Sequence, residues 1–380
     1  MTAHIVLVGG GHAHAGVLRL QAESRLIGAQ LTVISPSRLA AYSGMLPGWM
    51  AGHYTWQEIC LDFQALATKA GAQFVEGSVR SLDLEAKQLH LQDGTVMRFD
   101  VLSLNIGSTH RPPVSADASA VLPLRPLGDL MPRTREFVEQ YRQTQALLSV
   151  MVVGAGGAGF EMALAMQHSL KKAYPGRELR VSIVTDGTAP LPTHSKAVQR
   201  MAANILRERG VELIKDTVVE NIEGHHITLR QGSGSAQRSS VEYVEKIIWA
   251  GGAQPHLWPQ QSGLALDARS FIEVNAALQS TSHPFVFASG DCAGFDPPLP
   301  KAGVYPVRQG PLLAGNLAAA VSGAPLGPYV PQRRALGLFA TGPKHAIASY
   351  GPFAFSGAWV WRWKNRIDAR FIRNHSFKAE

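Results

Sequence analysis

The segment Leu148-Ser-Val-Met-Val-Val-Gly-Ala-Gly-Gly-Ala-Gly159 decides the fold, because it joins an apolar run to a complete GxGxxG pattern. The residues that follow it, Phe160 to Leu170, carry apolar side chains at helical spacing. A buried strand that turns through glycines into a helix brings backbone N–H groups and the positive end of the helix dipole to a pyrophosphate. We therefore predict a nucleotide-binding unit whose turn contains Gly154, Gly156, Gly157, Ala158 and Gly159.

A similar segment, Ile5-Val-Leu-Val-Gly-Gly-Gly-His-Ala-His14, lies near the start of the sequence. Its apolar run predicts a buried strand, and Gly9 and Gly11 allow a tight turn with the backbone close to a pyrophosphate. His14 replaces the third glycine, so this motif alone is weak evidence. Two motifs 145 positions apart (154 minus 9) nevertheless predict two nucleotide folds. The alternative is a pair of glycine-rich turns that bind no ligand. Residues 9–14 and 154–159 are called the first and second glycine motifs below.

The residue at the end of the second strand of such a fold usually binds the ribose hydroxyls of the nucleotide. In the first unit this strand ends at Ser35 and Pro36, and a serine binds ribose more weakly than an acid does. In the second unit the corresponding residue is Asp186, which favours NADH because a carboxylate repels a 2′-phosphate. Because Arg177 and Arg180 lie nearby, NADPH remains an alternative to NADH as the ligand.

A third apolar run, Pro284-Phe-Val-Phe-Ala-Ser-Gly-Asp-Cys292, predicts a late buried strand. It delivers the carboxylate of Asp291 at its carboxyl end, where parallel sheets bind their ligands. The next stretch, Lys301 to Gly310, opens a helix that is predicted to continue through Ala320. The N-terminus of that helix is suited to stabilising negative charge on a bound group.

The composition fits a globular α/β protein of two or three domains, with 380 residues, 46% hydrophobic residues and 37 glycines. The formal charge is +8 (36 basic minus 28 acidic residues), but no run of Lys or Arg is long enough for a nucleic-acid arm, so we expect no nucleic-acid partner. The two cysteines form no CxxC pair, and no Cys/His cluster predicts a metal site. Because the N-terminus lacks a secretory signal pattern, we expect a cytoplasmic protein.

In the order of its motifs the chain resembles the two-dinucleotide-binding-domain flavoproteins, the pyridine nucleotide-disulfide oxidoreductase superfamily. The resemblance runs from Ile5 to about Ala320 and rests on both glycine motifs, on the strand and turn of Phe99 to Ser108, and on the late Gly-Asp pair. Within the superfamily the chain looks like type II NADH dehydrogenases and sulfide:quinone reductases, in the branch often fused to selenide, water dikinase. The residues that suggest this branch are Gly9–His14, Tyr42–Gly48, Lys301–Tyr305 and Trp361–Asp368.

The resemblance implies an α/β fold with two Rossmann-like three-layer domains, the second inserted in the first. We expect an FAD-binding domain over 1–115 and 280–330, an NAD(P)H-binding domain over 116–279, and a C-terminal interface or membrane-associated segment over 331–380. The residues expected to hold FAD are Gly9, Gly11, His12, Ala13, Ser35, Pro36, Val79, Ile106, Gly107, Ser108, Gly290, Asp291, Ala302, Gly303 and Val304. Those expected to hold NAD(P)H are Gly154, Gly156, Gly157, Ala158, Gly159, Asp186 and Gly251.

The expected chemistry follows from the cysteines, which lie 232 positions apart (292 minus 60) and cannot form a redox pair beside the flavin. The flavin itself is then the relay between NAD(P)H and a two-electron acceptor such as a quinone. Glu161 matches the glutamate that follows the second motif in type II NADH dehydrogenases, where it contacts the nicotinamide side and manages protons; the alternative is an ordinary first-turn acid. Lys301 is a candidate for the pyrimidine edge of the flavin, or else a surface lysine.

The C-terminal segment Ser356 to Phe371 predicts an amphipathic helix. On a helical wheel Trp359, Val360, Trp363, Ile367 and Phe371 share one arc, with arginines largely opposite. This composition is typical of a helix at a membrane surface, and related quinone reductases attach to membranes through C-terminal helices. Peripheral attachment to the inner face of the cytoplasmic membrane is therefore one interpretation. The alternative is a helix that packs on the domain core or on a second subunit of a homodimer.

Two other functions stay open at this point. One is a flavoprotein that acts on a selenium or sulfur compound. The other is a flavin-based redox sensor whose partners change when NADH binds.

Overall fold

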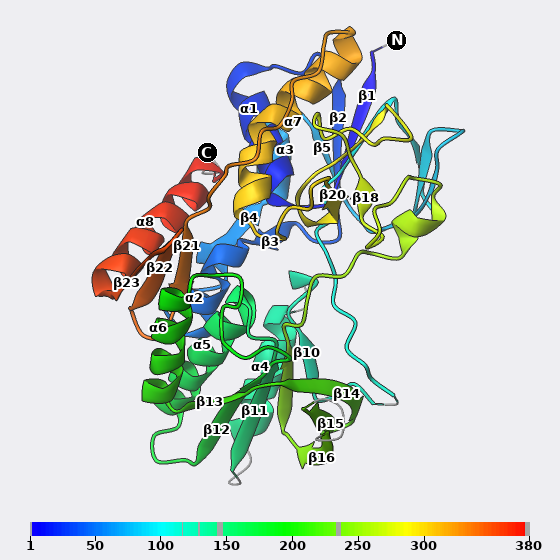
Figure 1. Cartoon of the computed structure of the whole chain (residues 1–380). Helices are drawn as coiled ribbons and strands as arrows, with labels where there is room; N and C mark the ends of the chain where they lie inside the picture. Colours follow the sequence, from blue (N-terminus) through cyan, green and yellow to red (C-terminus); the bar gives the residue numbers. More distant parts are fainter. Residues whose placement is uncertain (1, 116, 128–129, 143–146, 233–236, 377–380) are drawn as a thin grey trace.

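The computed structural model describes residues 2–115, 117–127, 130–142, 147–232 and 237–376, which form two α/β domains, one above the other in Figure 1. Each domain is built on a five-stranded parallel sheet. The chain runs through the first sheet, then the second, and returns to the first. The predicted fold class is confirmed.

The first sheet has the strand order β19-β9-β1-β2-β5, with every neighbouring pair parallel. In β1 the side chains of Ile5, Val6 and Leu7 have no exposed surface, as expected for a parallel strand covered on both faces. Helices α1 and α7 cross closely because glycines meet there: a Cβ atom on Gly16 would lie 3.2 Å from the Cα of Gly310. The elements are β1 (His4–Val8), α1 (His12–Ser24), β2 (Gln30–Ser35), α3 (Phe63–Ala70), β5 (Gln73–Glu76), β9 (Val101–Leu104), β19 (Val286–Ala288) and α7 (Val304–Ser322).

The second sheet has the order β10-β17-β11-β12-β13 and is likewise parallel. Helix α5, which follows the second glycine motif, packs on this sheet together with α6. The elements are β10 (Val121–Pro123), α4 (Leu130–Arg142), β11 (Leu148–Val153), α5 (Gly157–Ala173), β12 (Leu179–Val184), α6 (Lys196–Arg209), β13 (Val211–Ile214) and β17 (Lys246–Trp249).

Small antiparallel sheets and short helices complete both domains. The first domain holds β3 (Leu39–Ala41) paired with β4 (Cys60–Asp62), and the sheet of β6 (Val79–Asp83), β7 (Gln88–Leu91) and β8 (Val96–Arg98). The second domain holds β14 (Thr217–Glu223), β15 (His226–Gln231) and β16 (Arg238–Tyr243). The remaining short elements are η1 (Ser43–Met45), α2 (Leu46–Met50), η2 (Gln57–Ile59), η5 (Trp258–Gln261), β18 (Ile272–Glu273), η6 (Gly290–Cys292) and β20 (Ala293–Gly294).

Two crossing segments connect the domains, and they meet in an antiparallel bridge between Thr109 and Gln254. After this bridge Leu264, Ile272 and Val274 already belong to the hydrophobic cluster of the first sheet. The structure therefore places the return to the first domain well before residue 280, the boundary that we expected from the sequence.

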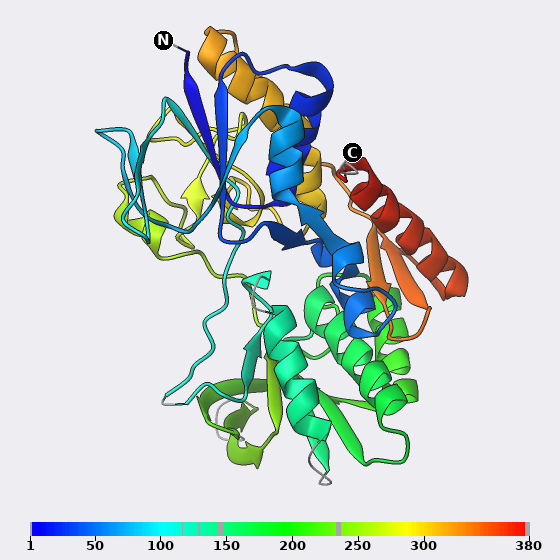
Figure 2. The same cartoon turned by 180° about the vertical axis from the view of Figure 1, so that it is seen from behind.

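A segment of the first domain also reaches into the second. Met45, Leu46 and Met50, around α2, join the hydrophobic cluster formed by α5 and the second sheet. In Figure 2 this segment lies between the two sheets, next to α5. The two domains are therefore joined by buried apolar side chains as well as by the two connecting segments of the chain.

The C-terminal residues form the sheet of β21 (Gly337–Ala340), β22 (Ala346–Tyr350) and β23 (Phe353–Gly357), followed by α8 (Ala358–Asn374). Figure 1 shows this orange sheet against the green helices α5 and α6, with the red helix α8 along its other side. The helix predicted here is present as α8, but the residues of its predicted arc differ in burial. Val360 and Phe371 are buried, whereas Trp359, Trp363 and Ile367 are between 41% and 49% exposed. The helix is turned so that Lys364 and Asp368 face inward.

Residues 147–160 contain β11 and the start of α5, as predicted from the apolar run and the second glycine motif. Among the described residues, no helix combines the length and the apolar character needed to cross a membrane.

Candidate functional site

The second glycine motif joins β11 to α5 at the carboxyl edge of the second sheet. Gly154 has φ +106°, and a Cβ atom there would lie 2.7 Å from the carbonyl oxygen of Ala250. A Cβ atom on Gly159 would overlap the carbonyl oxygen of Gly154, and one on Gly157 would lie 2.9 Å from the ring of Phe339. Gly156 differs, because no described atom lies within 4 Å of the position of its Cβ. Packing therefore explains three of the four glycines, and Gly156 opens onto space that a ligand can fill.

The expected ribose-binding residue, Asp186, is exposed just beyond the end of β12. Both arginines that left NADPH open have partners: Arg180 binds Glu212 at 3.1 Å, and Arg177 lies over the ring of Tyr174. Gly251, at the end of β17, lies beside the indole of Trp249, which is 3.3 Å from the position of its Cβ.

Glu161 lies one turn into α5, and its carboxylate accepts a hydrogen bond from the backbone N–H of Ala340 (2.7 Å). Burial raises the pKa of Glu161 from 4.5 to about 7, against the opposing effects of Lys364 and of the Ala340 N–H. With this pKa both the protonated and the ionised form of Glu161 are present near neutral pH.

Next to Glu161, helix α8 contains a buried ion pair that contacts the first domain. The ammonium of Lys364 donates to Asp368 (2.7 Å) and to the carbonyl oxygen of Gly44. Burial raises the pKa of Asp368, whereas Lys364 and a hydrogen bond from Tyr42 oppose that rise. The junction of α5, α8 and the segment after β3 thus brings together two carboxyl groups with raised pKa, Glu161 and Asp368, and the ammonium of Lys364. The sequence did not indicate that Lys364 and Asp368 belong to it.

The first glycine motif is held by a residue that sequence reasoning missed, Asn105, just after β9. Cβ atoms on Gly9 and Gly11 would overlap the backbone and the side chain of Asn105, respectively. The Asn105 amide accepts from the N–H of Ala13 (3.1 Å) and donates to the carbonyl oxygen of Ser289 (2.8 Å). It therefore fastens the start of α1 to the ends of β9 and β19.

His14, which replaces the third glycine, is completely buried in this frame. Its Nδ1 donates to the carbonyl oxygen of Gly9 (2.8 Å), so its Nε2 accepts from the hydroxyl of Ser103 (2.9 Å). Burial lowers the pKa of His14 to about 4, which keeps the ring neutral. His14 is thus part of the frame that holds the motif.

His12 faces the junction. Its ring centroid lies 5.1 Å from that of Tyr42 and 5.7 Å from that of Phe371, on α8. Burial lowers the pKa of His12 to about 4, although the nearby Asp291 acts in the opposite direction. A neutral imidazole here offers hydrogen bonding without adding charge.

Asp291, at the carboxyl end of β19, has an ion-pair partner that sequence reasoning also missed. Arg125 follows β10 in the second domain and donates to the carboxylate of Asp291 and to the hydroxyl of Ser108 (2.5 Å). The second domain therefore contributes a positive charge to the first nucleotide site.

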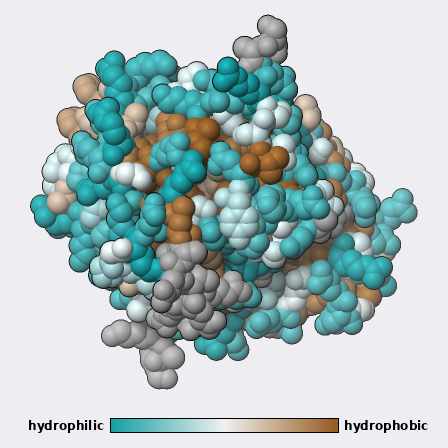
Figure 3. Space-filling model, turned by 90° about the horizontal axis from the view of Figure 1, so that it is seen from below, coloured by the Kyte–Doolittle hydropathy of each residue, from teal (hydrophilic) through white to brown (hydrophobic). Residues whose placement is uncertain are grey.

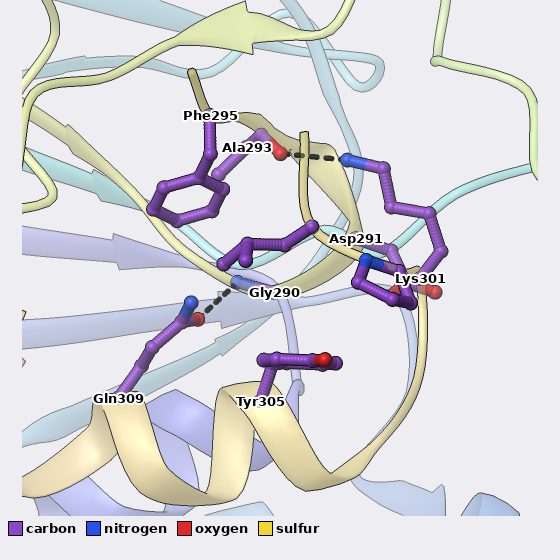
Figure 4. A pocket seen from close by; sticks show the side chains of 9 residues that line it. Gly290, Asp291, Ala293, Phe295, Lys301, Tyr305 and Gln309 are labelled. Carbon is purple, nitrogen blue, oxygen red and sulfur yellow. Dashed lines mark hydrogen bonds between the residues drawn. The ribbon is translucent and has the colours of Figure 1, made fainter. Parts of the chain in front are cut away.

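A small hollow that is open to solvent lies between Asp291 and the start of α7 (Figure 4). The Lys301 ammonium at its rim donates to the carbonyl oxygen of Ala293 (2.6 Å) and lies 3.8 Å from the centroid of the Phe271 ring. On α7, the fully buried Gln309 accepts from the N–H of Gly290 (2.7 Å), while its Nε2 has no partner among the described residues. An unpaired buried donor beside a carboxylate and a helix N-terminus fits a polar, anionic cofactor.

The structure thus brings most of the predicted residues together at two sheet edges. Ser35 lies 3.0 Å from the position of a Cβ on Gly10, Gly107 has φ +70° beside open space, and Gly303 lies next to Ser43. Pro36 is exposed, Val79 is buried in β6, and the carbonyl oxygen of Ile106 accepts from His256.

The chain is similar in sequence to a known family of proteins. A model of the pyridine nucleotide-disulphide oxidoreductase family matches residues 3–316. The type II NADH:quinone oxidoreductase Ndh of Mycobacterium tuberculosis is 30% identical over 232 residues, covering 57% of this chain and 48% of that protein. The alternative NAD(P)H-ubiquinone oxidoreductase C1 of Arabidopsis thaliana is 24% identical over 335 residues, covering 79% and 63%. The chain thus matches about half to two thirds of the length of these relatives.

Two solved structures share the fold over nearly the whole chain. The sulfide:quinone oxidoreductase of Aquifex aeolicus superposes with a TM-score of 0.82 at 17% identity, covering 100% of this chain and 93% of that one. NDH2 of Plasmodium falciparum, in complex with NADH, has a TM-score of 0.81 at 12% identity, covering 98% and 97%.

Proposed function

The chain belongs to the pyridine nucleotide-disulphide oxidoreductase family, and on that premise we propose that it is an FAD-dependent oxidoreductase that takes a hydride from NAD(P)H and delivers two electrons to a quinone or a similar acceptor. The observation that carries this proposal is the position of Glu161. This carboxyl group, with a pKa of about 7, lies where α5 of the second site meets α8 and the edge of the first site. Reduction of a quinone consumes protons, and such a group can supply them at neutral pH.

The first site has the residues to hold FAD. We assign the ribityl and pyrophosphate portion to Asp291, Arg125 and the Nε2 of Gln309, which has no partner among the described residues. We assign the flavin end to the start of α7 near Lys301. Bound there, FAD would supply the hydride-accepting ring and the two-electron store. The task of the chain is to bind and orient it, and the N-terminus of α7 favours negative charge on its pyrimidine edge.

The thiols support a route without a redox disulfide. Cys60 and Cys292 are both free and buried, and they belong to different hydrophobic clusters. Burial raises the pKa of the Cys292 thiol to about 11, and that of Cys60 to about 12, so both stay protonated and poorly nucleophilic. Electrons would then leave the first site directly for the acceptor.

The outer face of α8 supports peripheral contact with a membrane, where a lipid-soluble quinone would be found. The Trp359 and Trp363 rings stack with centroids 6.4 Å apart, and with Ile367 they form an exposed stripe beside Arg362 and Arg366. Exposed tryptophan beside arginine is typical of helices that lie at a lipid headgroup layer. Figure 3 shows hydrophobic areas among hydrophilic residues at the end of the molecule formed by the second domain, and we assign the contact to α8 because of its exposed tryptophans.

The proposal is tested by anaerobic stopped-flow mixing of the purified yellow protein with NADH and, separately, with NADPH. Fast bleaching of the flavin absorbance is expected, faster with NADH, followed by reoxidation when a short-chain ubiquinone is added. Bleaching without reoxidation by quinones, but with turnover of selenium or sulfur compounds, would favour the chalcogen alternative. A flavin that neither nucleotide bleaches would contradict the proposal.

A further inference from the structure

The C-terminal hairpin places an aromatic ring on the second glycine motif. Phe339, in β21, lies against the first turn of α5, where a Cβ atom on Gly157 would come within 2.9 Å of its Cε1. The two residues are 182 positions apart in the sequence (339 minus 157), and no pattern in either segment indicates the contact. Glycine at position 157 is therefore explained by the ring that occupies the space of a side chain there.

The ring is held in place from other sides as well. A Cβ atom on Gly337 would lie 2.8 Å from its Cε2, so a second glycine makes room for it. The imidazole of His194 packs edge-on against it, with ring centroids 5.0 Å apart, and is itself bonded to the hydroxyl of Ser349 (2.8 Å). Phe339 is nevertheless only half-buried. Its ring is thus fixed in orientation while part of its surface stays accessible.

The same strand also positions Glu161. The residue after Phe339 is Ala340, whose N–H binds the carboxylate of Glu161 at 2.7 Å. Strand β21 continues along α5, and a Cβ atom on Gly342 would lie 2.5 Å from the carbonyl oxygen of Leu164. Phe339 thus contacts α5 at Gly157, next to Gly156, and its neighbour Ala340 binds Glu161 one turn further along the helix.

We propose that Phe339 is a positioning residue of the NAD(P)H site, whose ring forms the wall against which the nicotinamide–ribose half of the nucleotide packs between Gly156 and Glu161. This inference rests on the proposed function, because it requires a nucleotide at the second glycine motif. A fixed aromatic face offers a flat apolar surface at low entropic cost and excludes water from the path of the hydride. The C-terminal segment then completes the nucleotide site in addition to covering the domain.

The test compares Phe339→Ala with the unaltered protein, both loaded with FAD. The ligand is NAD⁺, which cannot donate a hydride, titrated by calorimetry so that binding is measured apart from turnover. We expect the dissociation constant to rise about 2- to 12-fold, the range for loss of one aromatic contact. In steady state with NADH, KM should rise more than kcat falls, and Phe339→Tyr should restore both. Phe353→Ala, an exposed aromatic residue of β23 in the same sheet, is the matched control and should leave NAD⁺ binding unchanged.

A second variant guards against loss of structure as the cause. In Gly157→Ala the added methyl group must displace the ring, so NAD⁺ binding should weaken in this variant as well. In the double variant Gly157→Ala/Phe339→Ala the methyl group meets no ring, so the two effects should not add. Circular dichroism spectra and thermal midpoints would show that each variant is folded.

The outcomes separate this inference from the proposed function. Tighter NAD⁺ binding by Phe339→Ala would mean that the ring obstructs the site, and unchanged binding would mean that it takes no part; either result overturns the inference alone. If the unaltered protein neither binds NAD⁺ nor is bleached by NADH, the proposed function and this inference fall together.

Discussion

Replacing Glu161 by glutamine should make the protein more stable at neutral pH. Burial raises the pKa of Glu161 from 4.5 to about 7, so ionisation of this group opposes folding. Between these two pH values the folded protein binds more protons at Glu161 than the unfolded chain does, and stability therefore falls as the pH rises through this window. Glutamine keeps an oxygen for the N–H of Ala340 but does not ionise.

The size of the effect follows from the two pKa values. The difference between 4.5 and about 7 corresponds to about 3 kcal/mol at about 1.4 kcal/mol per pKa unit. The opposing effect of Lys364 is already contained in the pKa of about 7, so this figure is the full gain that ionisation of Glu161 allows. The gain should be absent near pH 4, where Glu161 is protonated in both states, and complete above pH 7.

Urea unfolding followed by circular dichroism at pH 4, 5, 6, 7 and 8 would measure the difference between the two proteins. Glu58→Gln is the control of opposite sign, because hydrogen bonds from Thr55 lower the pKa of Glu58 and its ionised form favours the folded state. A difference between Glu161→Gln and the unaltered protein that does not change with pH would refute the reasoning. Since the same ionisable group supports the proposed proton transfer, turnover should fall in the variant that is more stable.

Five further variants have expected outcomes. Gly156→Ala should unfold like the unaltered protein but bind NADH about tenfold more weakly, because the added methyl group enters space that only the ligand fills. Gly159→Ala should lose about 1–3 kcal/mol of stability, measured by urea titration, because its methyl group overlaps the backbone. Asp291→Ala should be purified without the visible flavin band, and stoichiometric FAD in the variant would contradict the assignment. Asp186→Ser should reduce the preference for NADH over NADPH, in kcat/KM, about tenfold or more, through loss of one charged hydrogen bond. Trp363→Glu should weaken co-sedimentation with anionic phospholipid vesicles while the rate with a water-soluble quinone stays unchanged.

The parts of the fold that the sequence predicts are those with local causes. An apolar run, a glycine turn and a helical repeat lie within about twenty residues in each unit, and the structure contains both units with their strands and helices where they were predicted. The carboxyl edges of the two sheets follow from these elements, and so do the positions of Asp186 and Asp291.

The parts that could not be predicted depend on contacts between distant segments. Arg125 reaches Asp291 across the junction between the domains, and Asn105 fills the space beside Gly11 from another strand. The orientation of α8 is of the same kind. A helical wheel places Trp363 and Phe371 on one arc, but the buried pair of Lys364 and Asp368 decides which face turns inward. Hydrophobicity alone assigns the opposite preference to those two charged residues.

The two glycine motifs look alike in sequence, but different neighbouring residues leave no room for side chains at their glycines. In the first motif Gly9 and Gly11 are both required by Asn105, and the missing third glycine is replaced by His14, which binds Gly9 and Ser103. In the second motif packing leaves Gly156 unexplained. A glycine that its own protein requires for packing says little about a ligand, so the first motif must be judged by Asp291, Arg125 and the Nε2 of Gln309 rather than by its pattern. In the second motif packing does not explain Gly156, so a substitution at this position should change ligand binding without changing the packing of the fold.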